Sequence, residues 1–435
     1  MDITVIGAGS HFTLHLLRSI YQTAPDDGYH IRLMDTRPEA RKALRSLARR
    51  FNAVTGRDIT YSVYDDQKKA IAGADHVLIA AAVDFPSAYL RTCWVMKDHG
   101  MNFVEGETAT PGALLATMRH LPVVLNVTDD VLAETDSAWI HIINNPMPRL
   151  VRGVIGARGY KKVVGHCHGT VETRKRLGAL FGIDDSHIEL DVAGINHFHL
   201  VLTAVDGRSG DNLLAGLAEL GQERDGFWRD QDFTQWTLYH ELGYFIGCGN
   251  WHNFDYLPYA NWRMFHHKDF NTWDRANIAV LARRQGGQAE VGNTLVERTS
   301  IMEFLANAET EQIFNIMRAL GGETDRYEYF SGNVENGGTW PGLPSEAIIE
   351  VPSFVSGQGV VPRQPVKGVP LFFETWVRTH LAVHELSVAA VVEGSRQAAI
   401  EAIAADPAFR DADCSPGVLL DEMMAANEGL VPCLG

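Results

Sequence analysis

The stretch VIGAGSHFT, residues 5–13, places two glycines directly after a short apolar run and before an amphipathic segment. Gly7 permits a tight turn from a strand into a helix, and Gly9 lets the backbone approach a pyrophosphate at the helix N-terminus. Ser10 lies in the same turn. Phe12 replaces the third glycine of the G-x-G-x-x-G pattern, so the dinucleotide-binding fingerprint is incomplete. We expect the two glycines and Ser10 to contact a dinucleotide.

An acidic residue supports this interpretation. Asp35 ends the next apolar run, where its carboxylate would accept hydrogen bonds from a ribose 2′-hydroxyl and repel a 2′-phosphate. It follows Gly9 by 26 residues, which is somewhat longer than the usual ~20. We therefore predict NAD rather than NADP, and Arg37, which could accept a 2′-phosphate, is the feature that would reverse this preference. The alternative is a glycine turn and a helix-capping Asp in a fold without a nucleotide.

Short apolar runs alternate with amphipathic segments through the first 190 residues. Strands are expected at 4–6, 30–34, 76–82, 139–144 and 162–165, with helices between them that include 11–21 and 38–51. Repeated strand–helix–strand units predict a parallel sheet with right-handed crossovers. We predict an α/β fold in which residues 1–190 form a Rossmann-like NAD-binding domain.

The pattern changes after residue 190. The segments that follow are two β-like runs at 188–194 and 198–204, an aromatic stretch at 227–273, a Gly-, Asn- and Pro-rich stretch at 332–362 with a strand at 347–351, and a helical stretch at 369–404. No repeat or low-complexity linker separates the two halves. We predict a mixed α+β lobe over residues 191–435 for substrate binding and oligomerisation, with a broad interface to the first lobe.

Composition excludes several classes of protein. The chain has 435 residues, which is long for a single core, and 38 Lys and Arg against 54 Asp and Glu give a net charge of −16. No dense basic run is present, so nucleic acid is not an expected partner. No run approaches the ~18 apolar residues of a membrane helix, and the start does not resemble a signal peptide. The five scattered cysteines favour a reducing, cytoplasmic location without disulfides.

Three segments place polar residues at the ends of expected strands, where an α/β sheet presents its ligand-binding crevice. They are IINNPMP with Asn144 and Asn145, GHCHGT with Cys167 and His168, and GINHFH with Asn196 and His197. A thiolate and an imidazole that converge on one crevice suit a borderline divalent metal with open positions for substrate oxygens. Taken singly, a Cys is more often a small buried hydrophobe and a His a satisfied polar group.

These motifs, in this order, resemble those of glycoside hydrolase family 4, the NAD- and divalent-metal-dependent glycosidases, over nearly the whole chain. The segment NVENGGTWPGLPSEAIIEVPSFVSGQGVVP, residues 333–362, is similar to a further stretch of that family. The resemblance implies that Cys167 and His197 ligate Mn²⁺ or a similar ion. It also implies a small-molecule glycoside as ligand and a homodimer or homotetramer. The residues expected to contact the sugar are Asn144, Asn145, Arg149 and Asn196.

The mechanism implied by the resemblance differs from the route with two carboxylates. NAD⁺ oxidises C3 of the sugar, a base removes the C2 proton, the aglycone is eliminated, water adds, and the hydride returns. The metal would stabilise the enediolate as a Lewis acid. Members in which His follows the metal-binding Cys act on unphosphorylated α-glycosides, whereas phospho-glycosidases have Asp there. His168 therefore predicts an unphosphorylated substrate, and we favour an α-glucuronide or an α-glucoside.

Several residues are candidates for proton transfer. His168 could protonate the leaving group or orient the substrate, and its alternative role is to cap a strand end. Glu107 in GETATPG stands where relatives often carry an Asp near the crevice. The relatives' base, an Asp or a Tyr, falls in GYFIGCGNWHNFDYLP, residues 243–258, at the position of Asn250. Asn cannot accept a proton, so the alignment is displaced, the protein is impaired, or another residue acts. The other residues in that stretch are His252, Asp255, Tyr244 and Tyr256.

Substrate identity depends on cationic partners. A uronate would need an Arg that makes two hydrogen bonds to its carboxylate, and Arg149 and Arg363 are the candidates, each of which is otherwise an ordinary surface residue. Two other functions fit parts of the sequence. The nucleotide lobe alone would suit an NAD-dependent dehydrogenase of a small hydroxy acid, and Asn250 would suit a catalytically silent binder of sugar or nucleotide.

Overall fold

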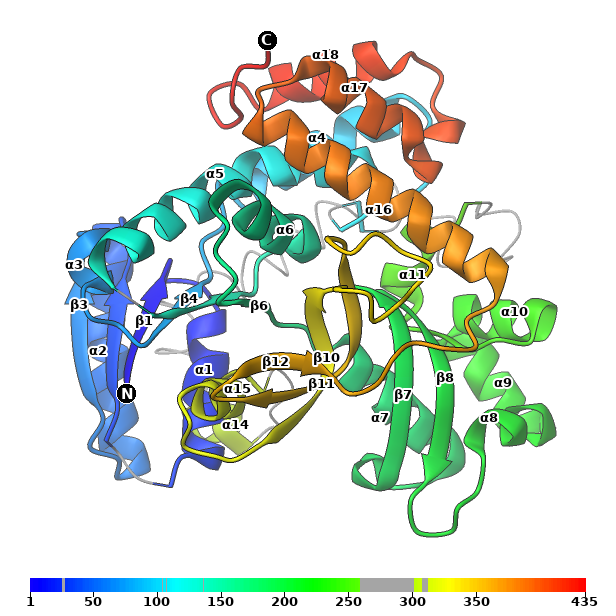
Figure 1. The fold of residues 1–435 in the computed structure, drawn as a ribbon, viewed down its shortest axis with the longest axis horizontal. Coiled ribbons are helices and arrows are strands. Elements are labelled where there is room, and N and C mark those ends of the chain that lie inside the picture. Colours follow the sequence, from blue (N-terminus) through cyan, green and yellow to red (C-terminus); the bar gives the residue numbers. More distant parts are fainter. Residues whose placement is uncertain (26–27, 104, 107, 136, 259–300, 307–311) are drawn as a thin grey trace.

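The computed structural model describes residues 1–25, 28–103, 105–106, 108–135, 137–258, 301–306 and 312–435. The amino-terminal part is a parallel sheet with the strand order β3-β2-β1-β4-β5-β6 (Figure 1). Its strands are β1 (Asp2–Ile6), β2 (His30–Met34), β3 (Thr60–Tyr64), β4 (His76–Ile79), β5 (Trp139–Ile142) and β6 (Val163–Gly165). The predicted Rossmann-like α/β fold is confirmed.

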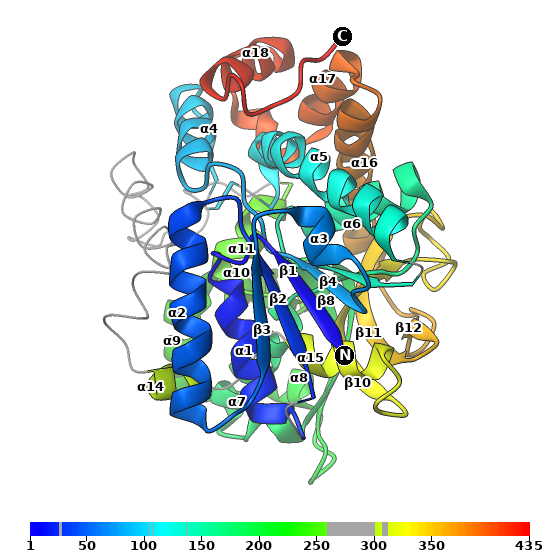
Figure 2. The same ribbon diagram turned by 90° about the vertical axis from the view of Figure 1, so that its left-hand side faces the viewer.

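Helices cover both faces of this sheet (Figure 2). On one face lie α1 (Phe12–Thr23), α2 (Pro38–Thr55) and α15 (Ile313–Leu320). On the other lie α3 (Gln67–Ile71), α5 (Thr110–Glu134) and α6 (Met147–Arg158). Although α15 belongs to the second half of the sequence, Phe314 and Met317 pack into the same core as α1. The predicted division of the chain near residue 190 stays a prediction.

The sheet does not stop at β6. It continues in the order β10-β11-β7-β8-β9, all in antiparallel pairing, and β12 adds to β11. These strands are β7 (Ile188–Ile195), β8 (Phe198–Asp206), β9 (Ile246–Gly247), β10 (Tyr327–Glu335), β11 (Ile348–Ser356) and β12 (Gly359–Pro362). The second half of the chain therefore has the predicted mixture of helices and antiparallel strands, and its strands extend the parallel sheet.

One row of directly paired residues crosses the junction between the two halves of the sheet. From β6 to β9 the row contains Gly165, Asn333, Glu350, Gly194, His199 and Gly247. Residues that pair directly across strands project to the same face. The polar members of the row therefore meet on one side of the sheet, with glycines between them.

The carboxyl-terminal helices form a separate layer, at the top of Figure 1, together with α4 (Ser87–Asp98). They are α16 (Leu371–Val392), α17 (Arg396–Ala405) and α18 (Pro416–Ala426). The single helical stretch predicted at 369–404 is two helices, because Gly394 adopts a positive φ of 65° and Ser395 caps the next helix by accepting the Ala398 N–H.

Two exclusions made from composition can be compared with the structure. Within the described ranges, no helix is both long enough and apolar enough to cross a membrane. All five cysteines are free thiols.

His99 provides a test of how the carboxyl-terminal layer is held. Its Nδ1 lies 2.9 Å from Asp413 Oδ1, and its Nε2 lies 2.9 Å from Glu422 Oε2 on α18. Hydrogen bonds to Asp413 and then to Glu422 raise the pKa of His99. Protonated His99 therefore stabilises the folded state through these two contacts. This stabilisation is complete below the ordinary histidine pKa of about 6.5 and is lost as the pH rises through the raised pKa of His99.

We predict that His99→Gln lowers the melting temperature relative to the wild type at pH 6 and that the difference narrows by pH 9. Thermal unfolding at both pH values measures this. An equal decrease in melting temperature at pH 6 and pH 9 would contradict the ionic role of His99.

Candidate active site

The dinucleotide motif forms one wall of a cleft at the carboxyl ends of β1 and β4. The cavity has a volume of about 520 Å³, and its lining includes Gly7, Ser10 and Asp35. Gly7 has a φ of 75°, and a Cβ there would lie 2.5 Å from Ala81 Cα, so only glycine fits this close approach. The Gly9 N–H donates to Asp35 Oδ2 at 2.8 Å. The four predicted cofactor-binding residues therefore lie together.

Asp35 is 4% exposed and already has partners on both carboxylate oxygens. Besides Gly9, the backbone N–H and Nε of Arg37 lie 2.9 and 3.2 Å from Asp35 Oδ1. A carboxylate offers about four acceptor positions, so capacity remains for a ribose hydroxyl. The Arg37 side chain is 51% exposed, so its guanidinium extends from Asp35 toward solvent.

The predicted sugar-contacting asparagines follow β5. Asn144 is 7% exposed; its Nδ2 donates to the Ala81 carbonyl, and its Oδ1 has no hydrogen-bond partner among the described residues. The Asn145 carbonyl accepts a hydrogen bond at 2.8 Å from His120 Nδ1. A buried amide oxygen without a partner is costly unless a ligand or water supplies a donor. Asn144 therefore fits a ligand that carries hydroxyl groups.

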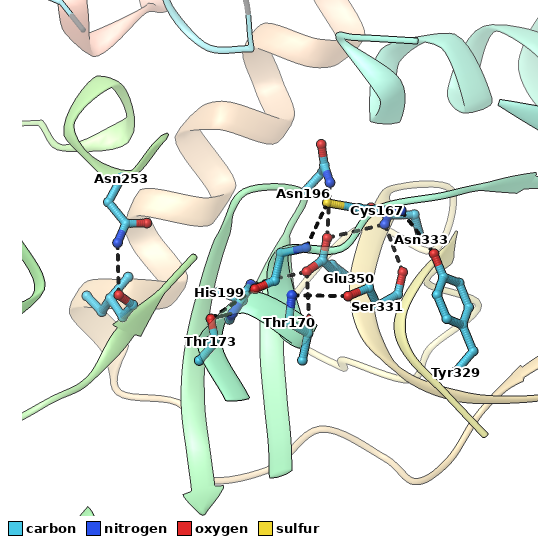
Figure 3. Close-up of polar contacts among 12 residues, drawn as sticks. Cys167, Thr170, Thr173, Asn196, His199, Asn253, Tyr329, Ser331, Asn333 and Glu350 are labelled. Carbon is cyan, nitrogen blue, oxygen red and sulfur yellow. Dashed lines mark hydrogen bonds and ion pairs between the residues drawn. The ribbon is translucent and has the colours of Figure 1, made fainter. Parts of the chain in front are cut away.

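Glu350 is the centre of a fully buried polar network (Figure 3). Its Oε1 lies 3.1 Å from Thr170 Oγ1 and 3.1 Å from His199 Nδ1. Its Oε2 accepts hydrogen bonds from Asn196 Nδ2 at 3.1 Å and from Asn333 Nδ2 at 3.2 Å. One carboxylate therefore connects β11 with β7, β8, β10 and α7 (Gly169–Phe181).

Gly194 makes this network possible. It pairs directly with both Glu350 and His199, and because it has no side chain, the carboxylate reaches the imidazole across it. A Cβ on Gly194 would lie 2.2 Å from the Phe198 carbonyl oxygen. Burial by itself would raise the pKa of Glu350, but the hydrogen bond and charge of His199, with the amides of Asn196 and Asn333, hold it below its ordinary value.

Cys167 follows β6, at the edge where Asn144 follows β5. It is 4% exposed. Its backbone N–H donates to Tyr329 Oη at 3.1 Å, and its Sγ accepts the Gly169 N–H at 3.2 Å. His168 is the N-cap of α7 and is partly exposed. The thiol is therefore fixed between the end of β6 and the first turn of α7.

His197 occupies the tight turn between β7 and β8 with a φ of 66°. It is 7% exposed, and its Nδ1 has no hydrogen-bond partner within the described part of the chain. Its ring lies against that of His252, with centroids 4.0 Å apart. Burial, and then the neighbouring imidazoles His252, His168 and His199, lower the pKa of His197 well below its usual range, which favours the neutral form that binds metals.

Glu105 was not predicted from the sequence, but it completes this cluster. One ligand atom each from Glu105, His197 and His252 lies within 4.8 Å of the other two. Two of them are already in contact, because His252 Nδ1 lies 2.7 Å from Glu105 Oε2. Two imidazoles and a carboxylate are suitable donors for a divalent ion.

The structure gives the remaining candidates different environments. The Asp255 carboxylate accepts the backbone N–H groups of Glu105 and Gly106, at 2.9 and 2.7 Å. Tyr256 is buried; its hydroxyl donates to the Thr108 carbonyl, and burial raises its pKa strongly. Both side chains are therefore engaged in structure, which argues against either as the base. Tyr244 is partly exposed and lies beside Phe372.

The two arginines considered for a uronate differ in their partners, since Arg363 pairs with carboxylates whereas the buried Arg149 Nε has no partner among the described residues. Arg149 is 1% exposed, and its Nη1 donates to Ser387 Oγ on α16 at 3.0 Å. Arg363 forms ion pairs with Glu328 at 2.6 Å and with Asp191 at 3.1 Å.

Two candidates have no described side chain. Glu107 lies outside the described residues, and Asn250 is described only as the first residue of α11 (Asn250–Tyr256).

Two family models match nearly the whole chain. The model of the family 4 glycosyl hydrolases matches residues 2–183, and the model of the family 4 glycosyl hydrolase C-terminal domain matches residues 192–409. The chain belongs to glycosyl hydrolase family 4. The family membership that the sequence motifs indicated is therefore confirmed, and so is the expectation of a glycosidase.

Relatives within family 4 cover the whole chain. An α-galactosidase of Bacillus subtilis is 24% identical over 99% of both chains, and an α-glucosidase of Erwinia rhapontici is 25% identical over 98% of both. A 6-phospho-beta glucosidase of Thermotoga maritima, solved with manganese, NAD⁺ and glucose-6-phosphate, superimposes with a TM-score of 0.81 at 21% identity and covers 100% of both chains. This likeness to a solved structure shows the common fold.

Glu350→Gln tests the buried network. The amide keeps the size of the side chain but replaces an acceptor oxygen with a donor beside four donors, so we predict a loss of about 3–5 kcal/mol in the free energy of unfolding. Urea denaturation measures it. Glu346→Gln, on an exposed residue of the same segment, is the matched control and should change the free energy by less than about 0.5 kcal/mol. Equal effects of the two substitutions would contradict the role of Glu350.

Proposed function

We propose that this chain hydrolyses an unphosphorylated α-glycoside with NAD⁺ and a divalent metal ion such as Mn²⁺, and that an α-glucoside is its substrate class. One observation carries the proposal. The dinucleotide cleft lies at the carboxyl ends of β1 and β4, and Asn144 after β5 donates to Ala81 in its lining, while Glu350 joins the residues that follow β6 and β7, next to the metal-binding side chains. A family 4 glycosidase needs both sites at one place.

The residues present fit both cofactors. Asp35 retains acceptor capacity for a ribose hydroxyl beside the Gly7 turn, and His197 is a buried imidazole whose Nδ1 is unpartnered among the described residues. Cys167 and His197 would hold the metal. NAD⁺ supplies a hydride acceptor, and the metal supplies a Lewis acid that makes a proton beside an oxidised carbon easier to remove.

The chain's own side chains would position the sugar and move protons. Asn144 would accept a hydrogen bond from a sugar hydroxyl through its unpaired Oδ1, and Asn145 beside it would contact a second hydroxyl. Asn196 keeps the turn of His197 in place through its bond to Glu350. His168, at the start of α7, would hold the proton for the glycosidic oxygen at one of its ring nitrogens.

Three observations favour a neutral, unphosphorylated sugar. The relatives named α-galactosidase and α-glucosidase align over nearly the whole chain. His168, rather than an Asp, follows Cys167. Arg363 is bound by two carboxylates, which weakens the support for it as the partner of a uronate. The homodimer or homotetramer and the cytoplasmic location stay predictions.

A glycoside panel tests the substrate class. With NAD⁺, Mn²⁺ and a thiol reductant, we predict hydrolysis of p-nitrophenyl α-glucoside at least tenfold faster, as kcat/KM, than hydrolysis of its 6-phosphate, and loss of activity in EDTA. The α-galactoside and α-glucuronide are the other arms of the panel. Preference for the 6-phosphate, or full activity after removal of both NAD⁺ and metal, would contradict the proposal.

Isotope exchange tests the reaction type. Because the proposed route removes the C2 proton and returns one from solvent, hydrolysis in D₂O should place deuterium at C2 of the released sugar, with no net accumulation of NADH. NMR of the product and absorbance of NADH measure the two outcomes. A product without deuterium would indicate direct hydrolysis, and stoichiometric NADH would indicate a dehydrogenase.

A further inference from the structure

Three segments far apart in the sequence bring metal-binding groups together beside the crevice. Glu105 lies in the loop before α5, His197 in the turn between β7 and β8, and His252 on α11. A ligand atom from each lies within 4.8 Å of the other two. The family resemblance assigns only His197 of these three to the metal. The other two are therefore an addition made by this chain's own fold.

The loop that carries Glu105 is fastened to the helix that carries His252. Asp255 on α11 accepts the backbone N–H groups of Glu105 and Gly106, at 2.9 and 2.7 Å. The Thr108 hydroxyl donates to Glu105 Oε2 at 3.0 Å. These bonds fix the direction of the carboxylate before any ion is bound. A site whose ligands are already held by neighbouring groups loses less conformational entropy on binding.

The two imidazoles lie face to face and share one carboxylate. The ring centroids of His197 and His252 are 4.0 Å apart, with an angle of 30° between the planes. The carboxylate contacts His252 Nδ1 at 2.7 Å, whereas His197 Nδ1 has no partner among the described residues. A divalent ion between the carboxylate and the two imidazoles would give the buried His197 Nδ1 a partner, which it lacks among the described residues.

We propose that Glu105 and His252 coordinate the divalent metal together with His197, so that one carboxylate and a second imidazole are added to the pair Cys167 and His197. Such a donor set leaves positions open for substrate oxygens and suits Mn²⁺, Fe²⁺ or Zn²⁺. The Cys167 Sγ, which accepts the Gly169 N–H, is not one of the three mutually close atoms of Glu105, His197 and His252, so its place as a ligand rests on the proposed function alone. The role of the ion in catalysis rests on the proposed function. The binding of the ion can be measured without any substrate, so it is tested separately.

The main competing role for Glu105 and His252 is a proton-transferring pair that never touches the metal. The same 2.7 Å contact would serve a carboxylate that orients an imidazole. The two roles differ in one measurable property. Loss of a metal ligand weakens metal binding itself, whereas loss of a proton-transferring pair lowers the rate and leaves metal affinity unchanged.

The experiment measures Mn²⁺ affinity of the metal-free full-length protein by the EPR signal of free Mn²⁺. We expect Glu105→Gln and His252→Gln each to raise the dissociation constant more than about a hundredfold, because loss of a direct ligand should exceed the 10–100-fold cost of losing an outer partner. His99→Gln is the matched control, since His99 also lies between carboxylates but in a separate surface cluster. It should leave the Mn²⁺ affinity unchanged.

A second measurement, made first on the wild type, covers the case in which a substitution prevents folding. Pulsed EPR of the Mn²⁺-loaded wild type should show couplings to two imidazole nitrogens, and His252→Gln should reduce them to one. Coupling to a single nitrogen in the wild type, or affinities within about threefold of wild type in both folded variants, would overturn the proposal. Metal binding as expected without hydrolysis of any glycoside would instead contradict the proposed function and leave this inference intact.

Discussion

The arrangement of the site depends on the buried carboxylate of Glu350. Its two oxygens contact side chains from β8, β10, α7 and the end of β7. The segments that carry Cys167 and His197 are therefore held in place by contacts with the same carboxylate. A buried carboxylate is tolerated only when hydrogen bonds replace its water, and here two amides, a hydroxyl and an imidazole do so. The network stands where the parallel and antiparallel halves of the sheet join.

This junction explains how one chain joins a nucleotide cleft to a metal-binding edge. The parallel strands alone would end in a cleft for a dinucleotide, as in many α/β proteins. The antiparallel strands, added through β10 and β11, place Gly194, close to the turn of His197, in the same row of paired residues as Gly165 at the end of β6. The glycine at position 194 lets Glu350 reach His199, so a backbone feature determines where a charge is placed. The register of the strands therefore also determines which polar side chains of the site meet.

The sequence predicted the parallel half well, because buried strands and amphipathic helices leave clear periodic patterns, and it located the turn at Gly7 and the residues after β5 and β6. It missed β3, whose TYSVY strand is polar and lies at the edge of the sheet, and β10, which lies partly in a Gly- and Asn-rich stretch. Glu105 could not be predicted, because its approach to His252 depends on folding across 147 residues. Glu350 lay within a recognised motif, but only strand register reveals its partners.

The most direct test of the whole account is the anomalous diffraction of crystals grown with Mn²⁺ and NAD⁺. The account predicts a manganese peak within bonding distance of His197, in the turn between β7 and β8, with the NAD⁺ pyrophosphate at the Gly7 turn. Manganese ordered only at another cluster, such as His99 with Asp413 and Cys414, or NAD⁺ bound away from Asp35, would contradict it.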